Sequence, residues 1–501
     1  MYVDLEFPPG VFANGTARQA RGRWRDSNLV RSPNGSDLQP VGGWSQRGTA
    51  AVSGLARAIV TWKDNANERW VAIGTHEKLY VQTVTGALVD ITPAGFTAGR
   101  PDASGEGGFG EGPYGVGAFG TGRPDTEDIQ PASVWTLDVW GEWLLGAMAE
   151  DGKLYLWKLD AATPTPAQVV SGAPTGVSGC SVSQERFIFV YRGRNIAWCD
   201  QEAETVWTAS ATNQAGDQDI DTEGTFRFGR KLRGGVQLHF TEVDVWSSTY
   251  LGPPFVHGFQ LAGADCGAVS TGAPVAIDSR CVWMGRKSFF LYDGTVNPLP
   301  CEVADKVFAD FDETQGSKVC AYHNTKHGEV WWFYPSAGSL EDDRYVLWNY
   351  RLNHWWVGAL ARTCGEGNGI FQNPIMVDPS GAIWEHEVGF SYPSGGETLT
   401  PFVRSGPVEW PSQGGMAQGD QRVVVKGFVA DEKSLGDATV TFYAREFPNT
   451  AETAFGPFAV SADPTDVVFS ARQLEMEVAF TGMDDARAGI FRLDALPVSR
   501  R

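Results

Sequence analysis

Several features that would point to familiar classes of protein are scarce or missing in this sequence. It contains no uncharged apolar run long enough to span a bilayer, and its N-terminus is acidic, without a positive region followed by an apolar stretch. We therefore expect no membrane span and no secretory signal. The chain is expected to be made and kept in the cytoplasm, or in something assembled there.

Paired cysteines are also missing. The seven cysteines are odd in number and widely spaced, and none forms a CxxC pair; they stand at Cys180, Cys199, Cys266, Cys281, Cys301, Cys320 and Cys364. This pattern indicates free thiols in a reducing compartment rather than a disulfide framework.

Basic side chains are few. Forty Lys and Arg stand against 60 Asp and Glu, which leaves a formal net charge of -20. Such a chain is poorly suited to neutralising nucleic-acid phosphates over a broad surface. The same charge suits a wall past which DNA slides without sticking, because like charges repel.

Aromatic residues and glycine are abundant: 19 Trp, 28 Phe and 13 Tyr accompany 60 Gly. The mixture favours strands that pack on aromatic cores and are joined by tight glycine turns. A unit of strand, polar turn and strand with an aromatic end recurs along the chain. Its aromatic ends are about 40 to 50 residues apart, the size of a four-stranded propeller blade, at Trp157, Trp198, Trp246, Tyr292, Trp332 and Trp384.

These observations predict an all-β fold. We expect a β-propeller of six or seven four-stranded blades over residues 45–395, because one such sheet cannot cover its own apolar faces and needs neighbours. An N-terminal arm with the first strands occupies residues 1–44. After a Ser/Gly/Pro-rich boundary, alternating strands predict a small antiparallel β-sandwich over residues 396–501.

A glycine-rich insertion interrupts the repeats at residues 95–123. Its glycines disfavour a regular element, so a long loop on one face is expected. Phe109, Tyr114 and Phe119 recur every five residues in it. They either anchor the insertion on a neighbouring subunit or belong to a disordered hairpin tip, and the sequence leaves both open.

Motifs that carry chemistry are weak here. Gly105–Gly110 matches GxGxxG without the expected strand and helix around it, and Asp217–Glu223 starts like a calcium loop but lacks the closing glutamate. His323 and His327 flank a turn with Glu329, where surface histidines are a better interpretation than zinc ligands. No Ser/His/Asp or Cys/His arrangement stands out, so we expect no enzyme, no cofactor and no metal.

One concentrated basic segment stands near the N-terminus. It either contacts DNA phosphates in a channel or docks on an acidic partner or a neighbouring subunit, and the second interpretation is preferred in so acidic a chain. Its residues are Arg18, Arg21, Arg23, Arg25 and Arg31, with Trp24 between them.

Two runs near the N-terminus resemble the opening of the packaged-DNA stabilisation proteins of short-tailed bacteriophages: Trp24–Val30 (WRDSNLV) and Leu38–Trp44 (LQPVGGW). The mid-chain runs Phe289–Gly294, Glu329–Tyr334 and Tyr345–Tyr350 are similar to the part of that family in which a blade strand is followed by a short helix and a hairpin pair. His354-Trp355-Trp356 likewise lies where such proteins place an aromatic after a tight turn. The insertion at 95–123 has no match in the family.

The resemblance implies a tail nozzle, or hub, protein of a podovirus tail. Six copies would form a ring below the portal and the tail adaptor, retain the packaged DNA and pass it during ejection without sequence-specific binding. Tail fibre or spike proteins would be further partners. An alternative is a receptor- or glycan-binding propeller of a phage tail, which would use exposed Trp and Tyr on one rim; a propeller hydrolase is a second rival.

Overall fold

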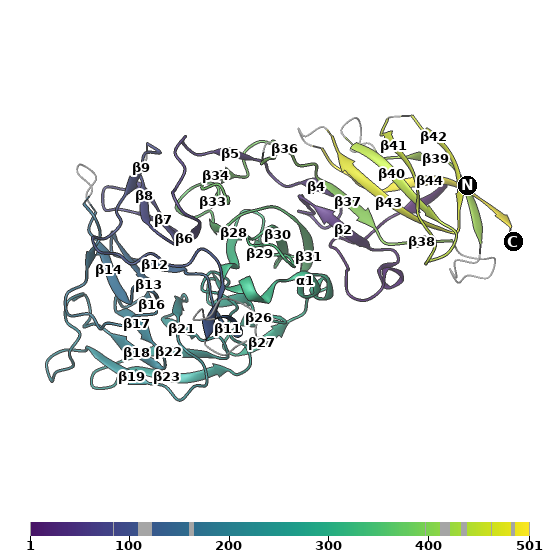
Figure 1. Ribbon diagram of the computed structural model, residues 1–501. Coiled ribbons are helices and arrows are strands. Elements are labelled where there is room, and N and C mark those ends of the chain that lie inside the picture. The colour runs from purple at the N-terminus through teal and green to yellow at the C-terminus, as the bar shows by residue number, and fades with distance from the viewer. Residues whose placement is uncertain are drawn as a thin grey trace.

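The computed structural model describes residues 2–83, 85–108, 123–159, 165–395, 397–410, 421–431, 438–461, 463–481 and 486–499. Almost all of these residues lie in antiparallel strands or the turns between them. Figure 1 shows an elongated molecule with a ring of sheets at one end and a second group of strands at the other. In the described part of the chain, no helix is both long and apolar enough to cross a bilayer.

Seven four-stranded sheets form the ring, which confirms the predicted propeller. The first four blades are β6–β9 (Ala56–Lys63, Arg69–Thr75, Leu79–Gln82, Leu88–Asp90), β12–β15 (Trp135–Trp140, Trp143–Met148, Lys153–Trp157, Gln168–Val169), β16–β19 (Gly179–Val182, Ile188–Arg192, Asn195–Trp198, Gly216–Asp219) and β20–β23 (Phe228–Lys231, Val236–Phe240, Val245–Gly252, Val256–Gly263). The fifth and sixth are β24–β27 (Val275–Ile277, Arg280–Met284, Phe289–Tyr292, Val296–Leu299) and β28–β31 (Cys320–Asn324, Glu329–Tyr334, Arg344–Asn349, His354–Ala359).

The seventh blade joins two distant parts of the chain. Its strands β32 (Cys364–Glu366), β33 (Ile375–Val377) and β34 (Ile383–His386) are completed by β5 (Trp44–Gln46), which pairs with β34. Trp44 is buried; its indole donates to the Pro393 carbonyl over 2.8 Å, and its ring stacks on His386. The N-terminal segment therefore closes the ring.

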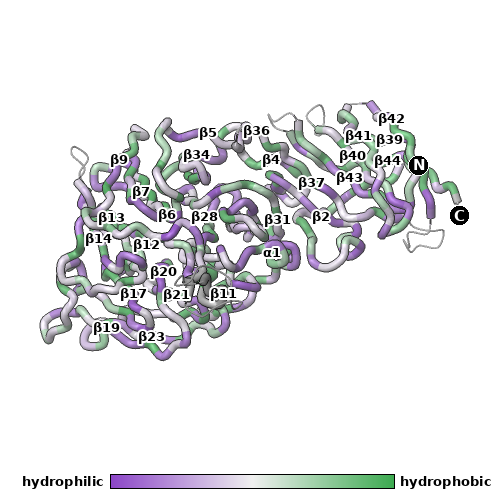
Figure 2. Tube along the Cα trace, viewed as in Figure 1, coloured by the Kyte–Doolittle hydropathy of each residue, from purple (hydrophilic) through white to green (hydrophobic). Residues whose placement is uncertain are grey.

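The blades pack through aromatic side chains whose polar atoms also find partners. Trp135 of the second blade donates to the Thr75 carbonyl of the first over 2.8 Å, and Trp332 of the sixth donates to the Ala273 carbonyl beside the fifth over 2.9 Å. A Cβ at Gly74 would lie 2.5 Å from the Trp135 ring, so this close approach needs glycine. All six residues of β29 are buried, because neighbouring blades cover both of its faces. Figure 2 accordingly shows hydrophobic residues spread over the strands rather than gathered in one segment.

Two connections between blades contain structure of their own. Between the fifth and sixth blades lie α1 (Ala304–Asp310) and the 3-10 helix η2 (Glu313–Lys318). Between the first and second, β10 (Ser104–Gly108) and β11 (Arg123–Gln130) form an antiparallel hairpin where the sequence predicted a loop. Its base is anchored by the Lys318–Asp102 ion pair at 2.6 Å. The predicted interface residues Phe109, Tyr114 and Phe119 lie outside the described residues.

The second part of the molecule contains two larger sheets. One has the order β1 (Tyr2–Leu5), β44 (Phe491–Ser499), β39 (Arg422–Val429), β42 (Thr465–Ala471); the other has β2 (Trp24–Asn28), β37 (Phe402–Ser405), β43 (Gln473–Phe480), β40 (Ala438–Arg445), β41 (Thr453–Ala459), with β38 (Val408–Glu409) also on β43. Phe442 of β40 contacts Phe428 and Phe469 of the first sheet. Each sheet takes one strand from the first 28 residues, which the sequence pattern did not predict.

Shorter elements surround these sheets. They are the 3-10 helix η1 (Ala17–Ala20) and the two-stranded sheets β3 (Val30–Arg31) with β4 (Gln39–Pro40) and β35 (Pro393–Ser394) with β36 (Glu397–Thr398). The segment that contains η1, β2 and β3 runs from the second part of the molecule to the propeller, and it carries the basic residues singled out in the sequence.

Replacing Trp44 by Ala tests the closure of the ring. We expect Trp44→Ala to lower the free energy of unfolding by about 3–5 kcal/mol, because it empties a buried aromatic site on the closing strand. Urea unfolding followed by tryptophan fluorescence measures this. Phe255→Ala is the control, since that side chain is 76% exposed, and a change within about 0.5 kcal/mol is expected there. Equal effects of the two substitutions would contradict the role of β5.

Candidate functional site

The basic segment is engaged within the chain. Arg18 and Arg21, at and just after η1, both lie near the buried carboxylate of Glu409 on β38, at 3.4 and 3.6 Å. Their own side chains are about half exposed: 56% for Arg18 and 47% for Arg21. One carboxylate of the second part of the molecule thus holds two of the arginines expected to meet a partner.

Of the next residues of the segment, Arg23 contacts the propeller, whereas Trp24 and Arg25 contact other N-terminal residues. Arg23 forms a 2.6 Å ion pair with Glu302, which stands between β27 and α1. Arg25 donates to the Phe12 and Gly15 carbonyls over 3.4 and 3.0 Å. Trp24 is buried, with its ring 4.6 Å from that of Phe7. The segment therefore joins the two parts of the molecule.

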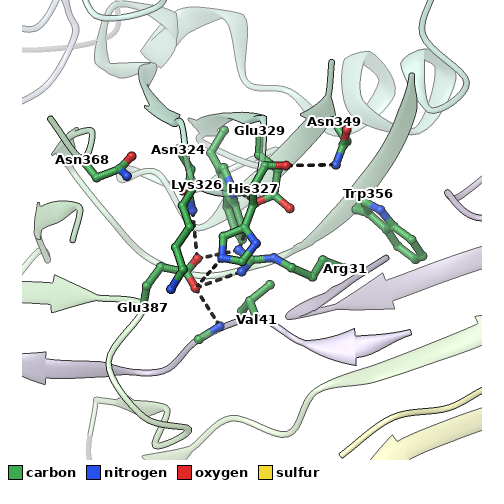
Figure 3. Close-up of polar contacts among 12 residues, drawn as sticks. Arg31, Val41, Asn324, Lys326, His327, Glu329, Asn349, Trp356, Asn368 and Glu387 are labelled. Carbon is green, nitrogen blue, oxygen red and sulfur yellow. Dashed lines mark hydrogen bonds and ion pairs between the residues drawn. The ribbon is translucent and has the colours of Figure 1, made fainter. Parts of the chain in front are cut away.

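Arg31 is the most deeply buried of these arginines (Figure 3). Its guanidinium donates to both oxygens of Glu387, at 2.5 and 2.9 Å, and to Glu329 of β29 at 3.0 Å. Glu387, which follows β34, also accepts from the Gly42 backbone at 3.2 Å and from Asn324 at 3.0 Å. One arginine thereby connects the N-terminal segment to the sixth and seventh blades.

The pKa values of the two carboxylates in this cluster are shifted in opposite directions. Burial alone would raise the pKa of Glu387, but the charge of Arg31 and its hydrogen bonds lower it to about 2. The pKa of Glu329 is raised, because burial and the charge of Glu387 outweigh the attraction of Arg31. Arg31 has a raised pKa, since its two glutamates overcome the effect of burial. The fixed ion pair is therefore Arg31 with Glu387.

The two histidines considered as zinc ligands, His323 and His327, contact different partners. His323 Nε2 lies 3.0 Å from the Tyr350 hydroxyl, whereas His327 Nε2 lies 3.6 Å from Glu387. Burial lowers the pKa of each to about 4, so both are neutral at pH 7. Within the described ranges, no group of three or more His, Cys, Asp or Glu could hold a metal ion.

The acidic run Asp217–Glu223 is likewise not arranged as a loop around an ion. Asp217 and Asp219 lie on β19, and the side-chain amide of Asn195 donates to both carboxylates over 2.8 Å. The first two carboxylates of the run are thus bound to the neighbouring strand β18.

The first strands of six blades line a central cavity of about 470 Å³. Its polar wall includes a 3.3 Å ion pair between Lys231 and Asp138, and Arg230, which donates to the Thr271 carbonyl over 2.9 Å. Glu366 of β32 stands in the same wall. Burial raises the pKa of Glu366 to about 7, against the opposing charge of Arg230. The cavity thus holds an acid that titrates near neutrality.

Sequence reasoning singled out Arg31 and Glu329 but did not connect them, and it missed Glu387, Arg230 and Glu366. Arg31 lies 298 and 356 residues from Glu329 and Glu387, so no local spacing signals the cluster. Glu366 stands at the end of a three-residue strand, too short for a periodic pattern to mark which way its side chain points.

Comparison with known proteins gives similarity in fold alone. No protein-family model matches the chain, and no curated protein matches it. Similar solved structures include a streptogramin B lyase (9% identity, TM-score 0.40, 68% of this chain and 96% of that one). Others are virginiamycin B lyase from Staphylococcus aureus (7%, 0.42, 68% and 98%) and BBS1N in complex with ARL6DN (11%, 0.38, 69% and 97%). At these identities and TM-scores the matches support no statement about activity or partners.

Removing the Glu387 carboxylate tests the Arg31 joint. We expect Glu387→Gln to reduce the free energy of unfolding by about 3–5 kcal/mol at pH 7, because it leaves the buried Arg31 guanidinium without its ionised partner. The folded pKa of Glu387 lies below the ordinary glutamate value of 4.5, so this stabilisation is present above pH 4.5. It is lost as the pH falls toward 2.

Chemical unfolding at pH 7 and at low pH measures the difference between wild type and variant, which should shrink on acidification. Glu202→Gln is the matched control, since that carboxylate is 62% exposed and pairs with Arg186 at 3.5 Å. Less than about 1 kcal/mol is expected there. A difference that grows toward low pH would refute the assignment.

For Glu366, the acid in the cavity wall, we expect the free energy of unfolding to depend on pH in the opposite direction. The folded pKa of Glu366, about 7, lies above the ordinary glutamate value of 4.5, so the folded state binds this proton more tightly than the unfolded state. The free energy of unfolding should fall as the pH rises from 4.5 to 7. Glu366→Gln should remove that part of the decline and stabilise the chain above pH 7, by at most about 3 kcal/mol. Stability profiles of the two proteins that stay parallel from pH 4.5 to 8 would disprove this.

Proposed function

We propose that this chain is a structural subunit of the tail of a short-tailed bacteriophage. Several copies form a nozzle ring that extends the DNA channel below the portal and adaptor. The observation that carries the proposal is the joint between its two parts: Arg31, Arg18, Arg21 and Arg23 fix the second part of the molecule to the propeller through buried or partly buried carboxylates. A ring that withstands the pressure of a packaged genome needs subunits that do not bend.

The charge of the chain supports the same role. A formal charge of -20 on each copy gives a ring that repels DNA as a whole, so the genome passes without adhering. The basic side chains of the N-terminal segment bind carboxylates of this chain, which favours a joint over a phosphate-binding surface. The role is mechanical rather than catalytic.

The proposed partners follow from the resemblance of the sequence to the nozzle family. They are further copies of this chain, six in a ring, with the tail adaptor above and fibre or spike proteins at the side. Assembly takes place in the host cytoplasm, and the finished protein lies in the virion tail.

Electron microscopy of virions tests this proposal. Antibody raised against the purified chain should label the tail tip of short-tailed virions that contain it, and averaged images should show a ring on the tail axis. Antibody against the major capsid protein is the control for specific labelling. Absence of the chain from virions, or labelling at peripheral spikes only, would reject the nozzle role.

The central cavity favours a second candidate, a glycan-binding propeller. A cavity of about 470 Å³ with Arg230, Glu366 and His323 in its wall falls within the range of small-ligand sites. Calorimetric titration with soluble glycans of the host surface separates the two roles, since the nozzle proposal expects no saturable heat. Saturable binding that Glu366→Gln weakens would favour the glycan-binding role.

A further inference from the structure

Most of the charged side chains in the wall of the central cavity are already paired with one another or with residues behind the wall. Lys231 and Asp138 form the 3.3 Å ion pair, and the Arg57 guanidinium binds both oxygens of Glu341, at 2.5 and 2.7 Å. In the described lining, Arg230 is the one cationic side chain that pairs with no carboxylate. The wall therefore holds a positive charge that an anionic ligand can compensate.

The guanidinium of Arg230 is fixed on one side and free on the other. Its Nε donates to the Pro274 carbonyl over 3.3 Å, and its Nη2 donates to the Thr271 carbonyl over 2.9 Å. Nη1 forms no hydrogen bond with a described residue, yet it is not among the polar atoms that the protein encloses. A ligand in the cavity can reach Nη1, and the guanidinium is already oriented to bind it.

Glu366 offers a second donor to the same space. Its residue is partly exposed, and no side chain of the described residues donates a hydrogen bond to its carboxyl group. The charge of Arg230 acts on this carboxyl, but burial outweighs it and raises the pKa of Glu366 to about 7. Below pH 7 the carboxyl is mostly protonated, and in that form it donates a hydrogen bond.

We propose that the central cavity binds a small ligand through a carboxylate group, which is held between Arg230 Nη1 and the carboxyl group of Glu366. A carboxylate accepts strong, charge-assisted hydrogen bonds from a guanidinium, and its single negative charge matches the one unpaired cation of the described wall. A doubly charged phosphate would bring surplus charge close to Asp138, whose two oxygens already accept from the Val139 and Val182 amides over 2.7 and 2.8 Å.

Glu366 makes this binding depend on pH. The other titratable side chains of the lining do not change protonation between pH 6 and 8. Burial lowers the pKa of His323 to about 4, raises that of Cys364 to about 12, and raises the pKa values of Tyr322 and Cys320. A bound carboxylate repels ionised Glu366, so it binds the protonated form. With a pKa of about 7, the affinity should fall about tenfold as the pH rises from 6 to 8.

Saturation-transfer NMR titrations of the full-length chain with acetate and with acetamide test the proposal. Acetamide has nearly the same shape as acetate and carries no charge. At pH 6 we expect acetate to bind more tightly than acetamide by about tenfold or more, because only acetate gains charge-assisted hydrogen bonds. Equal affinities for the two compounds would overturn the proposal.

A pair of arginine variants locates the binding. Arg230→Gln should weaken acetate binding by about tenfold or more. Arg233→Gln is the matched control and should change the affinity by less than about twofold. The Arg233 side chain is 82% exposed, pairs with Asp278 and lies outside the cavity lining. Equal effects of the two substitutions would show that acetate binds elsewhere, against the proposal.

Glu366→Gln gives a readout that does not depend on the folding of the Arg230 variant. The glutamine amide donates a hydrogen bond at every pH, so acetate should bind this variant equally at pH 6 and pH 8. At pH 8 it should bind the variant about tenfold more tightly than the wild type. A wild-type affinity that stays constant from pH 6 to 8, or a variant that keeps the wild-type pH dependence, would reject the role of Glu366 and with it the proposal.

The carboxylate can come from a free organic acid or from an acidic sugar, and titration with glucuronate and glucose separates the two sources. Glucuronate binding about tenfold tighter than acetate, with glucose not binding, would assign the ligand to a sugar and favour the glycan-binding role of the cavity. Acetate binding at least as tight as glucuronate would assign it to a free acid.

The inference does not rest on the nozzle ring, and the two fail separately. Preferential acetate binding by a chain that is absent from virions would keep the cavity site and reject the nozzle. A ring on the tail axis whose subunits bind acetate no better than acetamide would keep the nozzle and reject the cavity site.

Discussion

The structure depends on one constraint: a four-stranded sheet has two apolar faces and cannot cover either by itself. Seven such sheets solve this only by closing into a ring, and closure requires the last sheet to meet the first. The chain achieves it by pairing β5, from residues Trp44–Gln46, with β34. The N-terminal residues are consequently held against the end of the propeller, and their first strands, β1 and β2, are in place to join sheets whose other strands come from the C-terminal part.

The buried arginine follows from the same closure. The N-terminal segment lies against the sixth and seventh blades before it reaches β5, and there Arg31 binds Glu329 of the sixth blade and Glu387 at the end of the seventh. Two buried carboxylates beside one guanidinium cannot both be favourably ionised, which explains why the pKa of Glu387 falls while that of Glu329 rises. Such a cluster adds little stability compared with apolar packing, but removing one partner leaves a buried charge unpaired.

The repeated four-stranded blades could be predicted from the sequence, because their pattern recurs along the chain. Trp157, Trp198 and Tyr292 end the third strands of the second, third and fifth blades, and all three are buried. The residues of β40 alternate between buried and half-buried, as expected for a sheet with one covered face. It could not predict that three residues, Trp44–Gln46, complete a blade whose other strands begin at Cys364, since no periodicity exists at that length. Nor could it pair Arg18 with Glu409 or place Glu366 in the cavity, because those relations depend on closure rather than on local pattern. The preferred role of the arginines, contact with an acidic partner or a neighbouring subunit, stays a prediction; the carboxylates that bind them in the structure belong to the same chain.

The joint also determines what an assembly of these chains would look like. A closed ring is built by a single rotation repeated from copy to copy. If the two parts of the molecule could rotate freely, contacts made through both of them would not repeat the same rotation. Glu409, Glu302 and Glu387 bind the arginines of the connecting segment, so these ion pairs hold the two parts in one relative orientation. The contacts that complete the fold would therefore supply the regularity that the proposed nozzle ring requires.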